Sequence, residues 1–157
     1  MASLNSDPRL MRAYGYPYPA PEHDFLFRAG DVAPLDLSFD LGSRQPVIAV
    51  GSNRAPEQLA RKFGPEHDRT IPVTWAWMQG YDVVYCAHLA GYGSVPATLH
   101  GSPGTEVRVA ITWLTEEEAW VLSLLGEENG PRRAHLTERL SETTMLFEDP
   151  RFRVVLG

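Results

Sequence analysis

The strongest constraint on the fold is an apolar strand that runs directly into a turn and then into a helix. Residues 47–50 are apolar and rich in β-branched side chains, which favours a strand. The Gly-Ser-Asn sequence at 51–53 is typical of a turn. Residues 54–63 then predict a helix with Asn53 as its N-cap and Gly64 as its stop. Such a unit leaves backbone N–H groups free at the end of a rigid element.

Aromatic and β-branched runs predict further strands, most of them joined in pairs by turns. The predicted strands are 74–78 and 82–89, joined at Gln79-Gly80, then 94–99 and 106–113, joined by a turn at 100–105, and a last strand at 152–156. Thr115 and Glu118 form a capping-box sequence that begins a helix at 116–126. Strands outnumber helices, so we predict an α+β fold with a small mixed or antiparallel sheet in the form of a barrel.

Residues 1–46 differ in composition from the rest of the chain. They are rich in Pro, Tyr and Asp, with a Tyr-Pro-Tyr-Pro-Ala-Pro run at 16–21. Each Pro removes a backbone donor and disfavours helix in the residue before it. We therefore predict an extended N-terminal arm at 1–46 and one domain at 47–157. The aromatic residues favour an arm that packs across the domain or against a second copy of the chain, as in a homo-oligomer; the alternative is a loosely packed leader.

Charge and cysteine content exclude several kinds of partner and site. With 14 Lys+Arg against 20 Asp+Glu the net charge is −6, so nucleic acid and anionic membranes are not expected as partners. Cys86 is the only cysteine, which excludes an intrachain disulfide and a multi-cysteine metal site. The five histidines lack metal-ligand spacing, and neither a signal peptide nor a membrane span is recognisable. We expect a cytoplasmic protein without a metal or cofactor.

The turn at 51–53 is the first candidate site. Backbone N–H groups at the start of a helix can hold a carboxylate or a phosphate, although a plain turn between strand and helix would have the same sequence. A serine nucleophile at Ser52 is not expected, because the Gly-x-Ser-x-Gly pattern is absent. Nucleotide-binding glycine patterns are absent as well.

Two acids at the end of the predicted helix 116–126 are the second candidate. Glu127 and Glu128 lie where the helix dipole disfavours negative charge. If Val121 and Leu124 form the apolar face, Glu128 follows Val121 by seven residues and points inward. A buried carboxyl can serve as a general base. The alternative is an exposed acid pair at a frayed helix end.

The order of several short motifs along the chain resembles that of the gamma-glutamylcyclotransferase-like superfamily. The resemblance covers about residues 47–130 and is carried by Gly51-Ser52-Asn53 after a strand, Gly80-Tyr81 before a strand, Ala97-Thr98-Leu99, Pro103-Gly104, Val107, Trp113, and an acid at the end of a helix. It implies a small β-barrel with a few helices.

The resemblance also implies which residues form the site. The substrate loop would be Val50, Gly51, Ser52 and Asn53, with Val50 in place of the family's tyrosine and the backbone amides holding the anionic end of the substrate. Glu128 would transfer protons, because the family spacing Leu-x-x-Leu-x-x-x-Glu matches Val121, Leu124 and Glu128, and Glu127 is the fallback if the register slips by one.

The implied activity is an intramolecular cyclotransfer that releases 5-oxoproline from a γ-glutamyl amine or a related small amide. The substrate's own α-amine attacks its γ-carbonyl, so the protein has to fold the substrate and move protons rather than supply a nucleophile. The alternative is a non-catalytic domain of the same fold that binds a small ligand or another protein.

Overall fold

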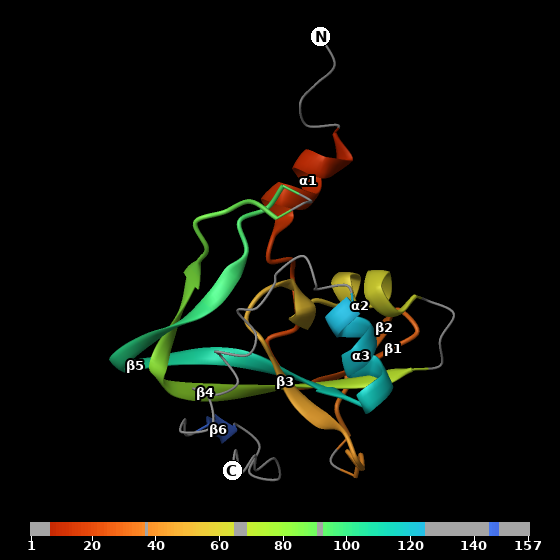
Figure 1. Ribbon diagram of the computed structural model, residues 1–157. Coiled ribbons are helices and arrows are strands. Elements are labelled where there is room, and N and C mark those ends of the chain that lie inside the picture. Colours follow the sequence, from red (N-terminus) through yellow and green to blue (C-terminus); the bar gives the residue numbers. More distant parts are fainter. Residues whose placement is uncertain (1–6, 37, 65–68, 91–92, 125–144, 148–157) are drawn as a thin grey trace.

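The computed structural model describes residues 7–36, 38–64, 69–90, 93–124 and 145–147, which form a mixed α+β fold (Figure 1). The helices are α1 (Pro8–Gly15), the short 3-10 helix η2 (Ser52–Arg54), α2 (Pro56–Phe63) and α3 (Glu116–Leu124). The strands are β1 (Phe25–Arg28), β2 (Asp31–Pro34), β3 (Gln45–Ala49), β4 (Thr70–Tyr85), β5 (Ala97–Leu114) and β6 (Met145–Phe147). None of the described helices has the length and apolar character needed to cross a bilayer.

The described strands form one antiparallel sheet in the order β2-β1-β4-β5-β3. One edge of β4 pairs with β5, and its other edge is shared by β1, opposite residues 70–73, and β6, opposite residues 76–78. Within the described residues, β2 and β3 are the two ends of this order and do not pair with each other. The predicted α+β class and antiparallel sheet are therefore confirmed.

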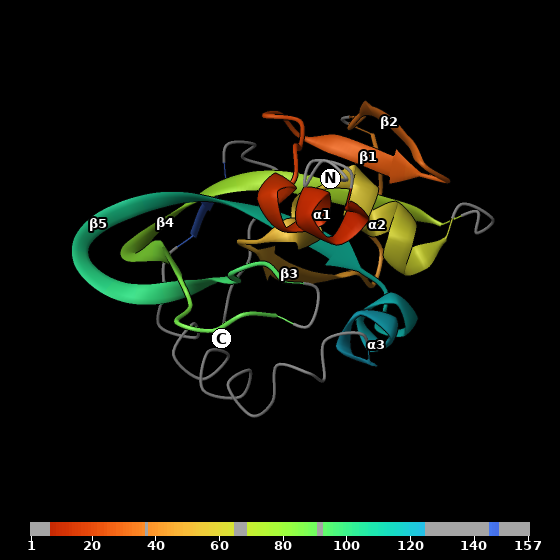
Figure 2. The same cartoon turned by 90° about the horizontal axis from the view of Figure 1, so that it is seen from above.

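The paired strands β4 and β5 are far longer than predicted. The sequence Gln79-Gly80 was expected to end a strand and residues 100–105 were expected to form a turn, but both lie inside continuous strands. Gln79 pairs with Glu106 and Tyr81 with Gly101, so residues 102–105 of β5 stand opposite Gly80 alone. The turn predictions were wrong because the glycines bend the two strands together rather than ending them: Gly80 has a φ of 77°. Figures 1 and 2 show the resulting fold-back of the β4–β5 ribbon.

The core lies on both faces of the sheet, because side chains alternate along β4 and β5. On one face, Phe25, Ile71, Val73 and Trp75 pack with side chains of α2 and α3. The other face is a second cluster, with Ala76, Met78, Val109, Ile111 and Trp113 at its centre. The central part of β4 is buried on both sides as a result, which explains its nearly continuous apolar sequence.

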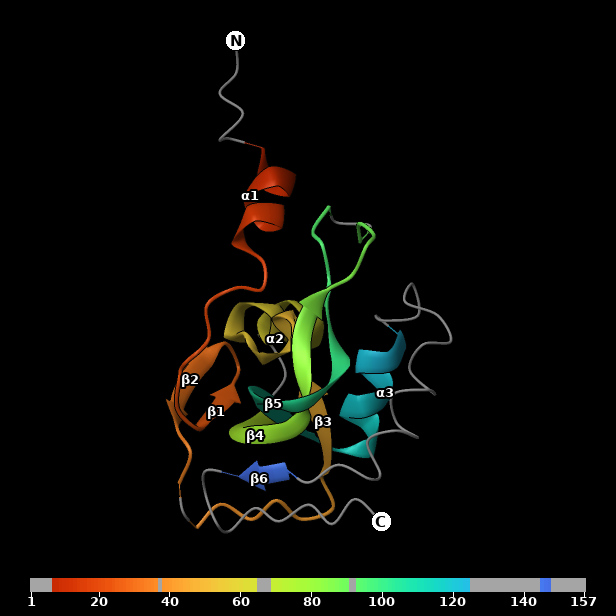
Figure 3. The ribbon, with the colours of Figure 1, turned by 90° about the vertical axis from the view of Figure 1, so that its left-hand side faces the viewer.

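The sequence predicted an extended arm at residues 1–46, but the described part of this segment includes a helix. Residues 8–15 form α1, which projects away from the sheet, and β1 and β2 form a hairpin that pairs with β4 (Figure 3). Phe25 and Phe27 are almost fully buried in the core, so this part of the segment packs against the domain. Strand β1 therefore belongs to the sheet, while the division of the chain near residue 46 stays a prediction.

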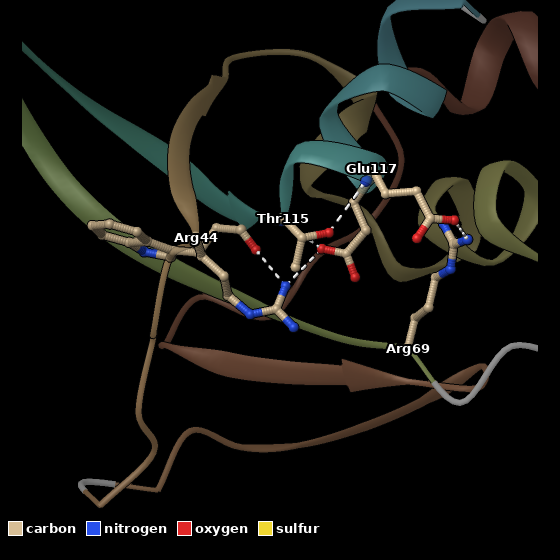
Figure 4. A network of polar contacts seen from close by, with 6 residues as sticks. Arg44, Arg69, Thr115 and Glu117 are labelled. Carbon is tan, nitrogen blue, oxygen red and sulfur yellow. Dashed lines mark hydrogen bonds and ion pairs between the residues drawn. The ribbon is translucent and has the colours of Figure 1, made fainter.

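The start of α3 is fixed by the capping box that the sequence predicted. The Glu118 backbone N–H donates to the Thr115 hydroxyl (3.3 Å), and the Thr115 backbone N–H donates to Glu118 Oε2 (2.8 Å). Glu118 is also buried against Arg44, whose Nη1 lies 2.6 Å from Oε2 (Figure 4). A second pair, Arg69 to Glu117 at 2.7 Å, lies at the surface. The first pair fixes α3 against the segment that precedes β3, and the second joins it to the residue before β4.

The face that α3 presents to the core includes Val121, one of the two residues of the predicted apolar face. Leu122 is buried and Val121 is half-buried against the core, but Trp120 is 63% exposed. The paired Glu118 occupies the inward position next to Thr115, so Trp120 turns outward. The predicted last strand, 152–156, lies outside the described residues.

Replacing Glu118 tests the contribution of this buried ion pair. We expect Glu118→Ala to lower the free energy of unfolding by about 2 kcal/mol or more, because Arg44 and the Thr115 N–H both lose their acceptor. Chemical denaturation measures the change. The control is Glu116→Ala, at an exposed position in the same helical turn, which should cost less than about 1 kcal/mol. Equal losses for the two variants would contradict the assignment.

Candidate functional site

The strand–turn–helix unit at the end of β3 has the predicted arrangement, with one correction. Helix α2 begins at Pro56, whose fixed φ suits the first helical turn, so Ala55 is the N-cap. Asn53 is therefore not the cap; it lies in η2, and its Oδ1 accepts a hydrogen bond from Lys62 Nζ (2.8 Å). Gly64 ends the helix as predicted, with a φ of 75°.

A cavity of about 220 Å³ opens beside this unit. One wall is the end of β3 and η2, with Ala49, Val50 and Arg54, and the other is the folded-back β4–β5 ribbon. The residues of the ribbon that line the cavity are Val83, Val84, Tyr85, Ala97, Val107, Arg108 and Val109, and Pro17 joins them from the N-terminal segment. The bend at Gly80 shapes the cavity, because residues from both sides of the bend line it.

Two arginines line this cavity together with Tyr85 and apolar side chains. The guanidinium carbon of Arg54 lies 5.4 Å, and that of Arg108 4.4 Å, from the ring centre of Trp75. Trp75 is held in place by two hydrogen bonds, from its backbone N–H to Asp24 Oδ1 (2.8 Å) and from Nε1 to the Pro21 carbonyl (3.1 Å). Arg108 also donates to the Glu22 carbonyl (2.8 Å). A buried aromatic ring therefore positions both cations.

The four residues of the predicted substrate loop have different surroundings. Val50 lines the cavity, and Ser52 is buried at the start of η2. Gly51 lies against the arm, and the side chain of Asn53 is bonded to Lys62. The predicted loop is thus adjacent to the cavity, and anion binding by its backbone amides stays a prediction.

Tyr16 connects the N-terminal segment to this loop. Its hydroxyl accepts a hydrogen bond from the backbone N–H of Ala97 (2.7 Å), at the start of β5. The same hydroxyl lies so close to Gly51 that a Cβ at this position would collide with it. Since the φ of Gly51 is −106°, this close approach is what requires glycine here. The arm thereby joins the two walls of the cavity.

The predicted catalytic acids cannot be placed. Glu127 and Glu128 lie outside the described residues. Of the residues on which their register depends, Val121 is half-buried against the core. Among the described residues that line the cavity there is no carboxylate. The described part of the chain also holds no group of three or more His, Cys, Asp or Glu residues suited to a metal ion.

Sequence reasoning missed Tyr16, Arg54 and Arg108 as residues of the site. Arg54 follows the turn motif directly and could have been considered with it. Arg108 alternates with Val107 and Val109, a pattern that equally fits a strand with one solvated face. No signal in the sequence joins it to Arg54, because the register of β3 on β5 brings the two together.

Comparisons of the chain with protein-family models, with curated proteins and with solved structures find no match. The resemblance to the cyclotransferases thus depends on the residues that carry it.

Replacing Gly51 tests the contact between the arm and the loop. We expect Gly51→Ala to displace the Tyr16 hydroxyl and so to speed hydrogen exchange at the Ala97 amide. Tyr16→Phe removes the hydroxyl and its hydrogen bond, at a cost of about 1 kcal/mol. The double variant should be more stable than the sum of the two losses predicts, because phenylalanine leaves room for the new methyl group. Strictly additive losses in free energy of unfolding would contradict the contact.

Proposed function

We propose that the chain is a cyclotransferase that releases 5-oxoproline from a γ-glutamyl amine or a related small amide. The observation that supports this best is the cavity of about 220 Å³ at the end of β3, beside the loop that the resemblance assigns to the substrate. A ligand pocket for a drug-sized molecule usually has a volume of ~300 Å³ or more. The smaller volume here suits a molecule of amino-acid size.

In the proposed reaction, the substrate's α-amine attacks its own γ-carbonyl. A new C–N bond closes the five-membered lactam, and the original amide C–N bond breaks. Glu128 accepts a proton from the α-ammonium group and later donates it to the departing amine, while amides of residues 51–53 hold the anionic end of the substrate. The reaction is balanced without a nucleophile, metal or cofactor from the protein.

The finer features of fold and location belong to this proposal as well. A closed barrel of the gamma-glutamylcyclotransferase-like type would require pairing beyond the open order of the described strands. The free Cys86 fits a reducing compartment, so we propose the cytoplasm as the location. Contact between arms of two copies remains our proposal for oligomerisation.

A second candidate function is binding without catalysis. It is favoured by one observation: among the described residues, the cavity is lined by two arginines, Tyr85 and apolar side chains, and by no carboxylate. Such a domain would hold a small anionic ligand in the same cavity.

Turnover separates these two functions. The protein should release 5-oxoproline from at least one member of a panel of γ-glutamyl amines, and Glu128→Gln should lower kcat by ~10² or more, because proton transfer is lost. Chromatographic detection of 5-oxoproline measures the rate. The matched control is Glu127→Gln, which removes the neighbouring charge and should leave the rate within a few-fold.

Three results would contradict the proposal in different ways. If no member of the panel is turned over, the chain is not this enzyme. A loss of rate in Glu127→Gln alone would assign the acid to the fallback position. Turnover that neither variant affects would remove both glutamates from the mechanism.

A further inference from the structure

The cavity contains a pair of cations that neither the turn motif nor the resemblance assigns. Arg54 comes from η2 and Arg108 from β5, and both guanidinium groups lie within 6 Å of the Trp75 ring centre. An aromatic ring face attracts a cation, but it does not neutralise the charge, so Arg54 can still pair with an anion.

One buried polar atom of Arg54 lacks an acceptor within the described part of the chain. Its Nε is buried and has no hydrogen-bond partner among the described residues, and Arg54 forms no ion pair with any of them. A buried donor without an acceptor costs free energy that a ligand oxygen can recover. Arg108 is held nearby by the Glu22 carbonyl and contributes a second positive charge.

From this arrangement we infer that Arg54, with Arg108 beside it, binds the carboxylate of a small molecule. A guanidinium group presents its N–H donors in a planar fork that matches the two oxygens of a carboxylate. The Trp75 ring fixes both forks before the ligand arrives, which lowers the entropy cost of binding.

The other cavity walls select among anions. Apart from the arginines and Tyr85, the lining side chains are apolar, with Val50, Val83, Val107 and Val109 among them. A phosphate would turn some of its oxygens toward these valines, where it would lose hydration without compensation. A carboxylate concentrates its charge at one end, so the aliphatic remainder of the molecule can contact the valines. The ligand is therefore a small carboxylic acid with a short, largely uncharged body.

This inference deepens the proposed function and depends on it only for the identity of the ligand. In the proposed reaction, the arginine pair would hold the α-carboxylate of the γ-glutamyl group together with the amides of residues 51–53, since Val50 and Arg54 line the same cavity.

Equilibrium binding tests the inference without turnover. The probes are 5-oxoproline, butyrate, the neutral amides of both and inorganic phosphate, titrated by isothermal calorimetry into the full chain. We expect at least one carboxylate to bind, about tenfold or more tighter than its own amide, and tighter than phosphate. Arg54→Gln should remove this preference, and Arg54→Lys, which keeps the charge but loses the fork, should retain part of it. The control is Arg12→Gln, on the exposed surface of α1, which should bind as the unchanged protein does.

Several outcomes would overturn the inference, and they differ from failure of the proposed reaction. Equal binding of acid and amide, tighter binding of phosphate, no binding of any probe, or unchanged binding in a folded Arg54→Gln variant would each reject the arginine site. Hydrogen exchange of the α2 amides shows whether that variant is folded. Carboxylate binding without release of 5-oxoproline would support the arginine site and reject the reaction. Release of 5-oxoproline at an unchanged rate in Arg54→Gln would support the reaction and reject the arginine site.

Discussion

The fold-back of the β4–β5 ribbon is the constraint on which the rest of the structure depends. A flat two-stranded ribbon would leave its distal half, residues 81–85 and 97–101, in solvent without a core to cover. Because four residues of β5 stand opposite Gly80, the ribbon bends, and its distal half returns over the end of β3. The same bend that completes the packing of Val83 and Leu99 also encloses the cavity.

The N-terminal segment connects the two walls of the cavity. The Tyr16 hydroxyl accepts a hydrogen bond from the start of β5 and lies in close contact with Gly51. Pro17 follows it into the cavity lining. The segment before β3 is thus part of the architecture of the site.

Local signals allowed part of the fold to be predicted. β3, α2 and the capping box of α3 depend on neighbouring residues, and each was predicted close to its observed position. The continuous course of β4 and β5 could not be predicted, because Gly80 and residues 100–105 have turn sequences and only long-range pairing decides between a turn and a bend. The exposure of Trp120 depends in the same way on a distant residue, Arg44, which holds Glu118 inward. The same holds for the site. The loop at 51–53 could be predicted from local sequence, whereas the proximity of Arg54 and Arg108 to one ring depends on long-range strand pairing.

We infer that the space between the end of β3 and the folded-back ribbon receives a small carboxylate. Nuclear magnetic resonance of ¹⁵N-labelled protein titrated with 5-oxoproline can locate such a ligand residue by residue. We expect shift changes to concentrate at the Arg54 Nε–H, the Trp75 indole N–H and the amides of residues 49–54 and 107–109. Shift changes confined to other parts of the molecule, or none at saturating ligand, would show that the cavity is not a carboxylate site.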